Sequence, residues 1–304
     1  MACVNGRIIK GIAGFYYVYV EDIGVVECKA KGLFRNKNIK PLVGDSVELE
    51  ILSEDEFSRA SDEVKAEGHI TEVLPRKNSL IRPASANIDQ VLLVFAVADP
   101  EPHLNLLDRF LISMEKKNLP VIILFNKTDL TEEDNVSELR QVYEKAHYKT
   151  FGIQALNSVN TAEVRECLKG KTTILAGPSG VGKSTFMNLM QPSARMETGA
   201  ISEKIRRGKN TTRHTELIHV EKDTFLLDSP GFSSLALDDI EAGELSDYYP
   251  EFAERKDGCR FAGCAHINEP DCAVKEALAE GLIAKERYEN YRKIYTELNS
   301  RKKY

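Results

Sequence analysis

The chain has 304 residues, 42% of them hydrophobic and 29% charged, with a formal net charge of −6. That length predicts two or three globular domains, and the charge argues against a surface that is basic throughout, although a local basic face is compatible with it. The longest apolar run, Val91 to Ala98, is too short to cross a bilayer, and the first residues contain no apolar signal region. We therefore expect a cytoplasmic protein with no membrane partner.

Residues 1–75 contain short strands separated by turn residues, a pattern that favours a small β-barrel. Strands are expected at Phe15 to Val20, Gly24 to Glu27 and Ser46 to Leu52. Between them, the stretch from Lys29 to Lys40 holds five cations, no acidic residue and the aromatic Phe34. Such a loop suits a nucleic-acid backbone, with the aromatic ring available for stacking, and a solvated loop is the alternative.

Residues 76–236 alternate between apolar strands and amphipathic helices. Strands are expected at Gln90 to Val97, Val121 to Phe125, Thr172 to Ala176 and Phe225 to Leu227, and a helix is expected from Leu106 to Met114. Continuous apolar strands alternating with helices predict an α/β domain in which a parallel sheet is covered on both faces.

A phosphate-binding loop follows the strand that ends at Ala176. The segment fits G-x-x-x-x-G-K-[ST] in full and precedes an amphipathic stretch, so its backbone N–H groups and the helix N-terminus are suited to phosphates. Lys183 is expected to bridge the β- and γ-phosphates, and the Ser184 hydroxyl is expected to ligate Mg²⁺. The predicted nucleotide contacts here are Gly177, Pro178, Ser179, Gly180, Val181, Gly182, Lys183, Ser184 and Thr185.

A guanine-reading motif, Asn126-Lys127-Thr128-Asp129, follows another apolar strand. The Asp129 carboxylate can accept two hydrogen bonds from guanine, whereas adenine lacks that pair of donors, so a buried Asp129 would discriminate strongly. Asn126 would brace the phosphate loop and Lys127 would cover the base. This motif precedes the phosphate loop, the reverse of the usual order, and a permuted sheet tolerates that because function depends on which strand ends are neighbours. Gln154-Ala155 lies where a small-residue loop would pack on guanine.

Two switch segments are predicted after the phosphate loop. Asp228-Ser229-Pro230-Gly231 fits D-x-x-G, with Asp228 holding Mg²⁺ through water and the Gly231 N–H sensing the γ-phosphate. Upstream, Arg206 to His214 is basic and contains Thr211 and Thr212, either of which could close on Mg²⁺ and the γ-phosphate. Phe232 stands where other GTPases place a water-orienting glutamine. We therefore expect slow intrinsic hydrolysis, with the missing group supplied by the first switch or by a partner.

Three cysteines and a histidine crowd into one short segment: Cys259, Cys264, His266 and Cys272. Four N/S ligands without an open position are typical of one structural Zn²⁺ site, and a redox pair or fortuitous clustering is the alternative. Three thiolates would leave the centre with net charge −1, which Lys256 and Arg260 could help offset.

Together these motifs resemble the ribosome small-subunit-dependent GTPase A (RsgA) family. The resemblance also includes Pro41 to Asp45 and Glu269-Pro270. It implies an N-terminal OB-type barrel that binds RNA (1–75), a circularly permuted P-loop GTPase domain (76–236) and a mainly helical C-terminal zinc domain (237–304). It further implies a monomer whose GTP hydrolysis is stimulated by the 30S subunit and its 16S rRNA during late assembly.

The family usually carries a histidine in the first switch, at the position of Asn210. Either Asn210 still positions the attacking water or His214 takes over. A second hypothesis is that loss of the γ-phosphate is relayed through residues 232–249 to the zinc domain.

Other functions also fit parts of this pattern. They are an RNA-binding scaffold gated by nucleotide with incidental turnover, a GTPase acting on the large subunit or another RNA, and an ATP-dependent kinase. Asp129 disfavours the kinase, and the pairing of a barrel with a zinc cluster disfavours the large-subunit GTPase.

Overall fold

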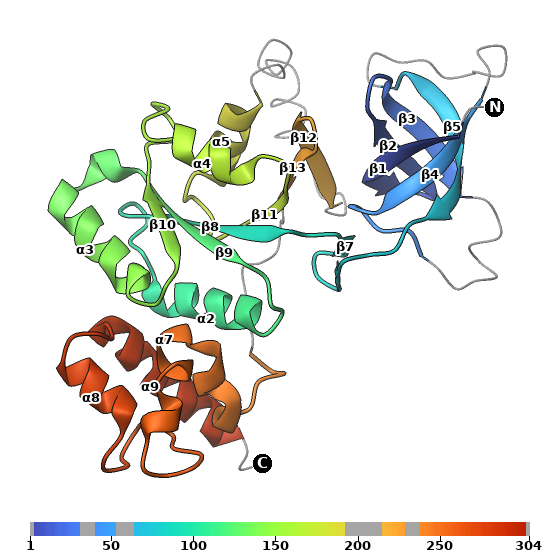
Figure 1. Cartoon of the computed structure of the whole chain (residues 1–304). Helices are drawn as coiled ribbons and strands as arrows, with labels where there is room; N and C mark the ends of the chain where they lie inside the picture. Colours follow the sequence, from blue (N-terminus) through green and yellow to red (C-terminus); the bar gives the residue numbers. More distant parts are fainter. Residues whose placement is uncertain (1–2, 31–39, 53–63, 192–214, 229–236, 302–304) are drawn as a thin grey trace. The chain divides into compact units, whose positions relative to one another are not determined.

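A computed structural model describes residues 3–30, 40–52, 64–191, 215–228 and 237–301 (Figure 1). The chain divides into two compact units. The first comprises Met1–Asp89, Arg165–Leu175 and Met190–Gly231, and the second comprises Gln90–Val164, Ala176–Leu189 and Phe232–Tyr304. Among the described helices, none is both long enough and apolar enough to span a membrane.

Five strands of the first unit close into an OB-like barrel: β1 (Cys3–Ile12), β2 (Phe15–Val20), β3 (Gly24–Ala30), β4 (Ser46–Ile51) and β5 (Ala66–Val73). Strand β1 pairs antiparallel with both β2 and β4, while β5 pairs with β4 and runs parallel to β3, which completes the ring. The barrel is filled by alternate inward-facing side chains such as Ile8, Val18, Val26 and Leu49, all fully buried. A small hairpin follows, made of β6 (Ser79–Leu80) and β7 (Ser85–Ala86).

Three further strands belong to the first unit: β11 (Thr172–Ala176), β12 (Glu216–Glu221) and β13 (Thr224–Asp228). Strand β11 is parallel to β13, as expected from the apolar runs, whereas β12 returns antiparallel to β13 as a hairpin. The barrel strand β1 pairs with the outer strand β12, with Lys10 opposite Glu216.

The second unit begins with three parallel strands in the order β10 (Lys149–Gly152), β9 (Val121–Asn126) and β8 (Gln90–Ala96). Strands β8 and β9 are buried along their whole length, which explains why their sequences show no polar alternation. The accompanying helices are α2 (Leu104–Glu115), η2 (Thr128–Leu130), α3 (Glu133–Glu144) and α5 (Lys183–Met190), and the boundary with the first unit falls within α4 (Ala162–Leu168). The prediction of parallel strands is thus confirmed for β8 and β9, whereas β10, which extends the same parallel order, was not predicted.

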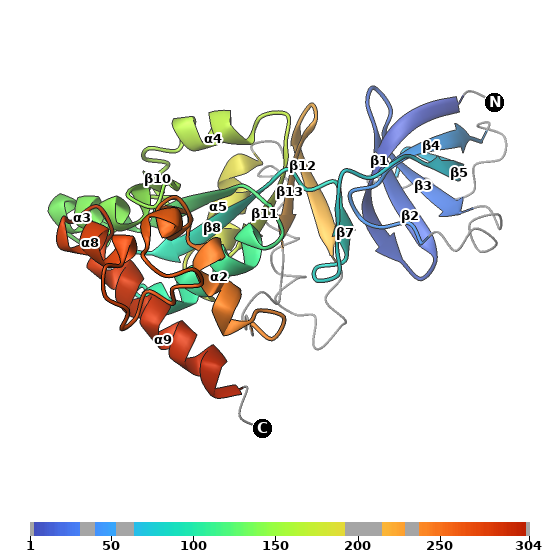
Figure 2. The same cartoon turned by 60° about the horizontal axis from the view of Figure 1, so that its bottom comes forward.

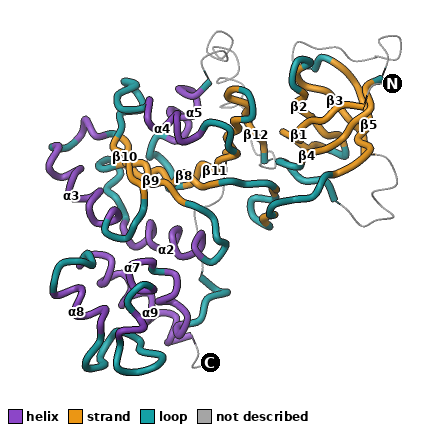
Figure 3. Tube along the Cα trace, in the orientation of Figure 1, coloured by secondary structure: helices purple, strands orange, loops and turns teal. Residues whose placement is uncertain are grey.

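The C-terminal segment is mainly helical: η4 (Ala242–Tyr248), α7 (Pro250–Ala253), η5 (Lys256–Gly258), α8 (Ala273–Ala279) and α9 (Lys285–Arg301). Figure 3 shows helices and loops here, in contrast to the barrel, where the described chain is strands and loops. Along α9, Tyr288, Tyr291, Ile294 and Leu298 recur at helical spacing and form one buried face. Helix α9 packs beside α2 (Figure 2), so this core continues onto the helix that follows β8.

Candidate nucleotide site and metal centre

The phosphate loop connects Ala176, the end of β11, to Lys183, the start of α5. Gly177 has φ +137°, and a Cβ at this position would lie 2.1 Å from the Val94 carbonyl oxygen, so glycine is required there. The Lys183 amine donates hydrogen bonds to the carbonyl oxygens of Gly177 (2.9 Å) and Pro178 (2.5 Å). The Lys183 amine therefore lies over the loop that is predicted to bind the nucleotide phosphates. Ser184 is exposed in the first turn of α5.

Asn126 joins three segments that are far apart in the sequence. Its side chain is buried; Nδ2 donates to the Val181 carbonyl (2.9 Å) in the phosphate loop, and Oδ1 accepts from the backbone N–H of Ala155 (2.9 Å). Gly182 (φ +96°) packs so closely that an added Cβ would lie 2.2 Å from Asn126 Nδ2. The guanine-reading motif, the Ala155 loop and the phosphate loop thus meet at one neutral side chain, as their inverted chain order requires.

The remaining residues of the guanine-reading motif follow β9, with Lys127 preceding the short helix η2 that contains Thr128 and Asp129. Lys127 is in the left-handed region (φ 61°), and its amine donates to the Asp99 carbonyl. Thr128 donates its backbone N–H to the Ile153 carbonyl (3.2 Å). Asp129 is exposed. This differs from the buried carboxylate on which the discrimination argument rested, so selection for guanine requires the bound base itself to cover Asp129.

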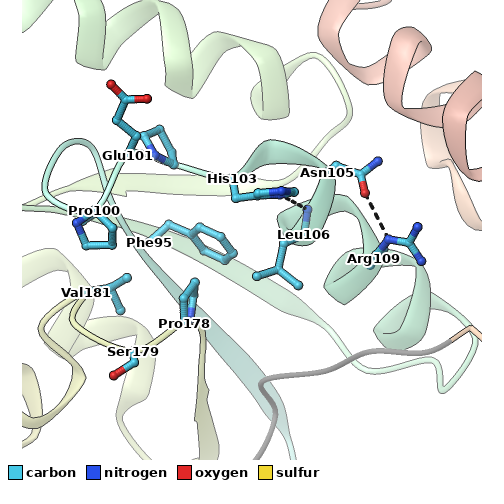
Figure 4. A pocket seen from close by; sticks show the side chains of 12 residues that line it. Phe95, Pro100, Glu101, His103, Asn105, Leu106, Arg109, Pro178, Ser179 and Val181 are labelled. Carbon is cyan, nitrogen blue, oxygen red and sulfur yellow. Dashed lines mark hydrogen bonds between the residues drawn. The ribbon is translucent and has the colours of Figure 1, made fainter.

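A cavity of about 370 Å³ flanks the phosphate loop (Figure 4). Phe95, Leu106, Pro100 and Pro178 supply its apolar wall, and Arg109 lies near its edge. The cavity was not predicted, because its wall combines the loop after β8 with the phosphate loop, two segments distant in sequence.

Of the predicted Mg²⁺ ligands and switch residues, the structure describes Ser184 and Asp228. Asp228 is half-buried at the last position of β13. The predicted catalytic and switch residues Asn210, Thr211, Thr212, His214, Gly231 and Phe232 lie outside the described residues.

The four predicted metal ligands converge: their ligand atoms all lie within 4.8 Å of one another. His266 Nδ1 is 3.6 Å from Cys259 Sγ and 3.4 Å from Cys272 Sγ, and those two sulfurs are 3.9 Å apart. Tetrahedral Zn²⁺ with Zn–S of about 2.3 Å and Zn–N of about 2.0 Å separates its ligand atoms by roughly 3.5–3.8 Å. The donor set and its spacing are therefore compatible with a zinc site.

Glu269 organises the loop that carries His266. Its carboxylate accepts hydrogen bonds from the backbone N–H groups of Ala265 (2.9 Å), Ile267 (3.0 Å) and Asn268 (3.0 Å). Burial alone would raise the pKa of Glu269, but these donors outweigh it and lower the pKa. Tyr288 of α9 adds a bond from its hydroxyl to the His266 carbonyl (2.7 Å).

The cations expected to offset the metal centre have carboxylate partners instead. Lys256 pairs with Asp247 (2.9 Å) and Arg260 with Asp271 (2.8 Å). Each of these cations is therefore shared with an exposed carboxylate, and its contribution to the charge of the metal centre stays a prediction.

A buried charge cluster attaches the C-terminal segment to α2. Arg287 donates to Asp108 (2.7 Å) and to Glu251 (2.8 and 3.1 Å), and all three side chains are at most 1% exposed. Asn290 donates to the other Asp108 oxygen (2.7 Å), and the Arg287 guanidinium lies 4.4 Å from the centre of the Tyr249 ring. The available sequence signal was Arg287 at helical spacing from the buried face of α9, but an arginine on a helix is ordinarily solvated.

The fold and the site define a circularly permuted GTPase, and comparison with known proteins leads to the same class. The RsgA GTPase family model matches residues 73–238 and the RsgA N-terminal domain model matches residues 5–56. The chain is similar to "Small ribosomal subunit biogenesis GTPase RsgA" of Agathobacter rectalis, with 50% identity over 99% of this chain and 100% of the relative.

Two solved structures are also similar over nearly the whole chain. One is YloQ, described as a circularly permuted GTPase (36% identity, TM-score 0.77, 99% of this chain and 96% of that one). The other is YjeQ from Thermotoga maritima (35% identity, TM-score 0.78, 98% and 99%). The chain belongs to the RsgA GTPase family, and it is a GTP hydrolase that uses guanine nucleotide and Mg²⁺.

Proposed function

We propose that this GTPase acts in late assembly of the small ribosomal subunit and that the 30S subunit stimulates its GTP hydrolysis. The observation that carries the proposal is the junction at Asn126, which brings the guanine-reading motif against the phosphate loop in a chain whose relatives are named for small-subunit biogenesis. In this proposal, the protein acts as a cytoplasmic monomer and its barrel contacts 16S rRNA.

The residue roles in this proposal follow from the motifs. Asp129 reads the guanine edge and Lys127 covers the base. Lys183 neutralises the β- and γ-phosphates, while Ser184 and Asp228 serve Mg²⁺, Asp228 through water. Thr211 or Thr212 closes on the γ-phosphate, and Asn210 or His214 orients the attacking water. A structural Zn²⁺ on Cys259, Cys264, His266 and Cys272 fixes the C-terminal loop, and these four donors would hold it without an open position for chemistry.

The test is steady-state GTP hydrolysis by the full chain alone, with 30S subunits and with 50S subunits. We expect 30S subunits to raise the turnover at least tenfold, because the chain has phenylalanine where a water-orienting glutamine would stand. Turnover that is unchanged by 30S subunits would contradict the proposal and favour a nucleotide-gated scaffold. Equal stimulation by 50S subunits would contradict the assignment to the small subunit.

Asp129→Asn tests recognition of the guanine base separately from stimulation by 30S subunits. The asparagine amide donates where the carboxylate accepts, so the variant should lose affinity for GTP by about a hundredfold or more and gain affinity for xanthosine triphosphate. Hydrolysis of xanthosine triphosphate by this variant should still respond to 30S subunits. GTP affinity equal to that of the wild type would exclude Asp129 as the guanine reader.

A further inference from the structure

The hairpin formed by β12 and β13 connects the two predicted switch segments, since the first precedes residue 215 and the second begins at Asp228, the last residue of β13. The same hairpin is bonded to the barrel. Strand β1 of the barrel pairs with β12, and the Lys10 amine lies 3.1 Å from the Glu216 carboxylate across that pair. A strand of the barrel therefore continues the sheet that contains the hairpin.

An aromatic contact reinforces this junction. Tyr19 of β2 stacks on His219 of β12, with ring centres 3.9 Å apart and an interplanar angle of 25°. Tyr19 also meets the edge of Phe225 on β13, at 5.9 Å, and His219 lies 5.3 Å from the same ring. One barrel side chain thus contacts both strands of the hairpin. The His219 ring is further fixed by a 2.8 Å hydrogen bond between Nε2 and the Lys222 carbonyl at the hairpin turn.

Arg7 of β1 reaches the strands that lead to the nucleotide. Its guanidinium donates to Thr172 Oγ1 (2.5 Å), at the first position of β11, and lies 5.2 Å from the centre of the Phe225 ring. Strand β11 ends directly before the phosphate loop, and β13 ends at Asp228. Thr172 is itself fully buried, and its N–H donates to the Asp89 carboxylate (2.8 Å). Arg7 of the barrel therefore contacts both β11, which leads to the phosphate loop, and β13, which ends at Asp228.

We propose that Arg7, Tyr19, His219 and Phe225 form a clamp through which the state of the switch segments reaches the RNA-binding barrel. The proposal rests on the proposed function because it requires the segments before and after the hairpin in the sequence to act as switches. This route to the barrel is separate from the relay through residues 232–249 to the zinc domain that the sequence suggests. A change of nucleotide that shifts β12 against β13 shifts the partner of Tyr19, and the barrel strands β1 and β2 follow because they are bonded to the same hairpin.

The clamp is testable without the ribosome, by hydrogen–deuterium exchange of the full chain with GDP and with a non-hydrolysable GTP analogue. In the wild type, we expect nucleotide-dependent exchange at residues 215–228 and also in β1 and β2, with rates there differing by about threefold or more. In His219→Ala the response at 215–228 should persist, while the response of β1 and β2 disappears. His219→Phe preserves the stacked ring and should preserve both responses.

A charge exchange at the edge of the junction supplies a second, less disruptive perturbation. Lys10→Glu places like charges opposite each other on β1 and β12, and we expect it to weaken the barrel response. The double variant Lys10→Glu/Glu216→Lys restores an opposite pair and should restore that response.

Wild-type protein whose barrel exchange is the same with both nucleotides would overturn the proposal, as would a barrel response that survives His219→Ala. Neither result would bear on the proposed function, because stimulation of GTP hydrolysis by 30S subunits is measured separately. Conversely, unstimulated hydrolysis with an intact barrel response would contradict the ribosomal function and retain the clamp.

Discussion

The nucleotide end and the C-terminal domain of the second unit are each held together by a buried polar residue, but of opposite kinds. At the nucleotide end, the neutral Asn126 joins three loops through backbone groups, while the Asp129 side chain is exposed. In the C-terminal domain, Arg287 forms ion pairs with two carboxylates, and all three side chains are buried inside the protein. The loops at the nucleotide end are thus held together by a neutral side chain. The permanent contact between the C-terminal domain and α2, by contrast, is made by buried charged side chains.

The largest effect should come from removing the Zn²⁺ that we propose for the C-terminal domain, since structural Zn²⁺ in small domains supplies on the order of 10 kcal/mol of folding free energy. A strong chelator, or Cys272→Ser, should abolish order around residues 256–272, measured by hydrogen exchange. GTP affinity should change by no more than about twofold because the Asn126 junction does not involve this loop. Cys167→Ser, outside the cluster, is the matched control. A chelated protein with an ordered C-terminal loop would refute the zinc assignment.

Arg287→Met tests the buried charges. It leaves Asp108 and Glu251 buried without their cation, so the free energy of unfolding should fall by about 3–5 kcal/mol in denaturant titrations. Burial already raises the pKa of Asp108, and Arg287 partly offsets that rise. Arg292→Met, exposed on the same helix, should cost less than about 0.5 kcal/mol. Neutralising both acids in Arg287→Met/Asp108→Asn/Glu251→Gln should recover part of the loss. A single variant as stable as the wild type would contradict the cluster's role.

Asn126→Ala tests the neutral brace. It leaves the Ala155 N–H and the Val181 carbonyl without their partner, at about 1–3 kcal/mol each, and frees the phosphate loop from the guanine motif. We expect the affinity for a fluorescent GDP analogue to fall about a hundredfold. Asn160→Ala removes an exposed asparagine whose amide donates to Gly152, and it should bind nucleotide like the wild type. Equal affinities for both variants would show that Asn126 does not organise the site.

The smallest effect concerns Glu297 on α9, which pairs with Arg109 of α2. The bonds from Arg109 lower the pKa of Glu297 below its usual value. A carboxyl whose folded pKa is lowered stabilises above its unfolded pKa, and this contribution is lost as pH falls through the folded pKa. Glu297→Gln should therefore lower the midpoint of thermal unfolding by about 1 °C at pH 7, and this deficit should shrink as the pH falls through the folded pKa of Glu297. Glu286→Gln, exposed on the same helix, should show no such pH-dependent difference. A deficit that stays constant from pH 7 to the most acidic pH at which the protein remains folded would exclude the ion pair as its cause.

The sequence predicted the parts of the fold that repeat a simple pattern. The apolar runs located β8, β9, β11 and β13, and the motifs located the phosphate loop and the metal cluster. Strands β1 and β5 were not predicted, because their residues alternate with Arg7, Lys10, His69 and other polar side chains that face outward from a barrel.

What could not be predicted depends on contacts between distant segments. The pairing of β1 with β12, the antiparallel return of β12 and the partners of Arg287 each join residues far apart in the chain. The exposure of Asp129 likewise depends on how the turn after β9 is oriented. No periodicity within one element records such pairs.

The most direct test of the account is a crystal structure with a non-hydrolysable GTP analogue and Mg²⁺. It should show the guanine edge within about 3.2 Å of the Asp129 carboxylate and the terminal phosphates on the loop from Gly177 to Ser184, with the Lys183 amine turned from the loop carbonyls toward them. A nucleotide bound to the phosphate loop with its base in a cavity away from Asp129 would contradict the permuted GTPase site.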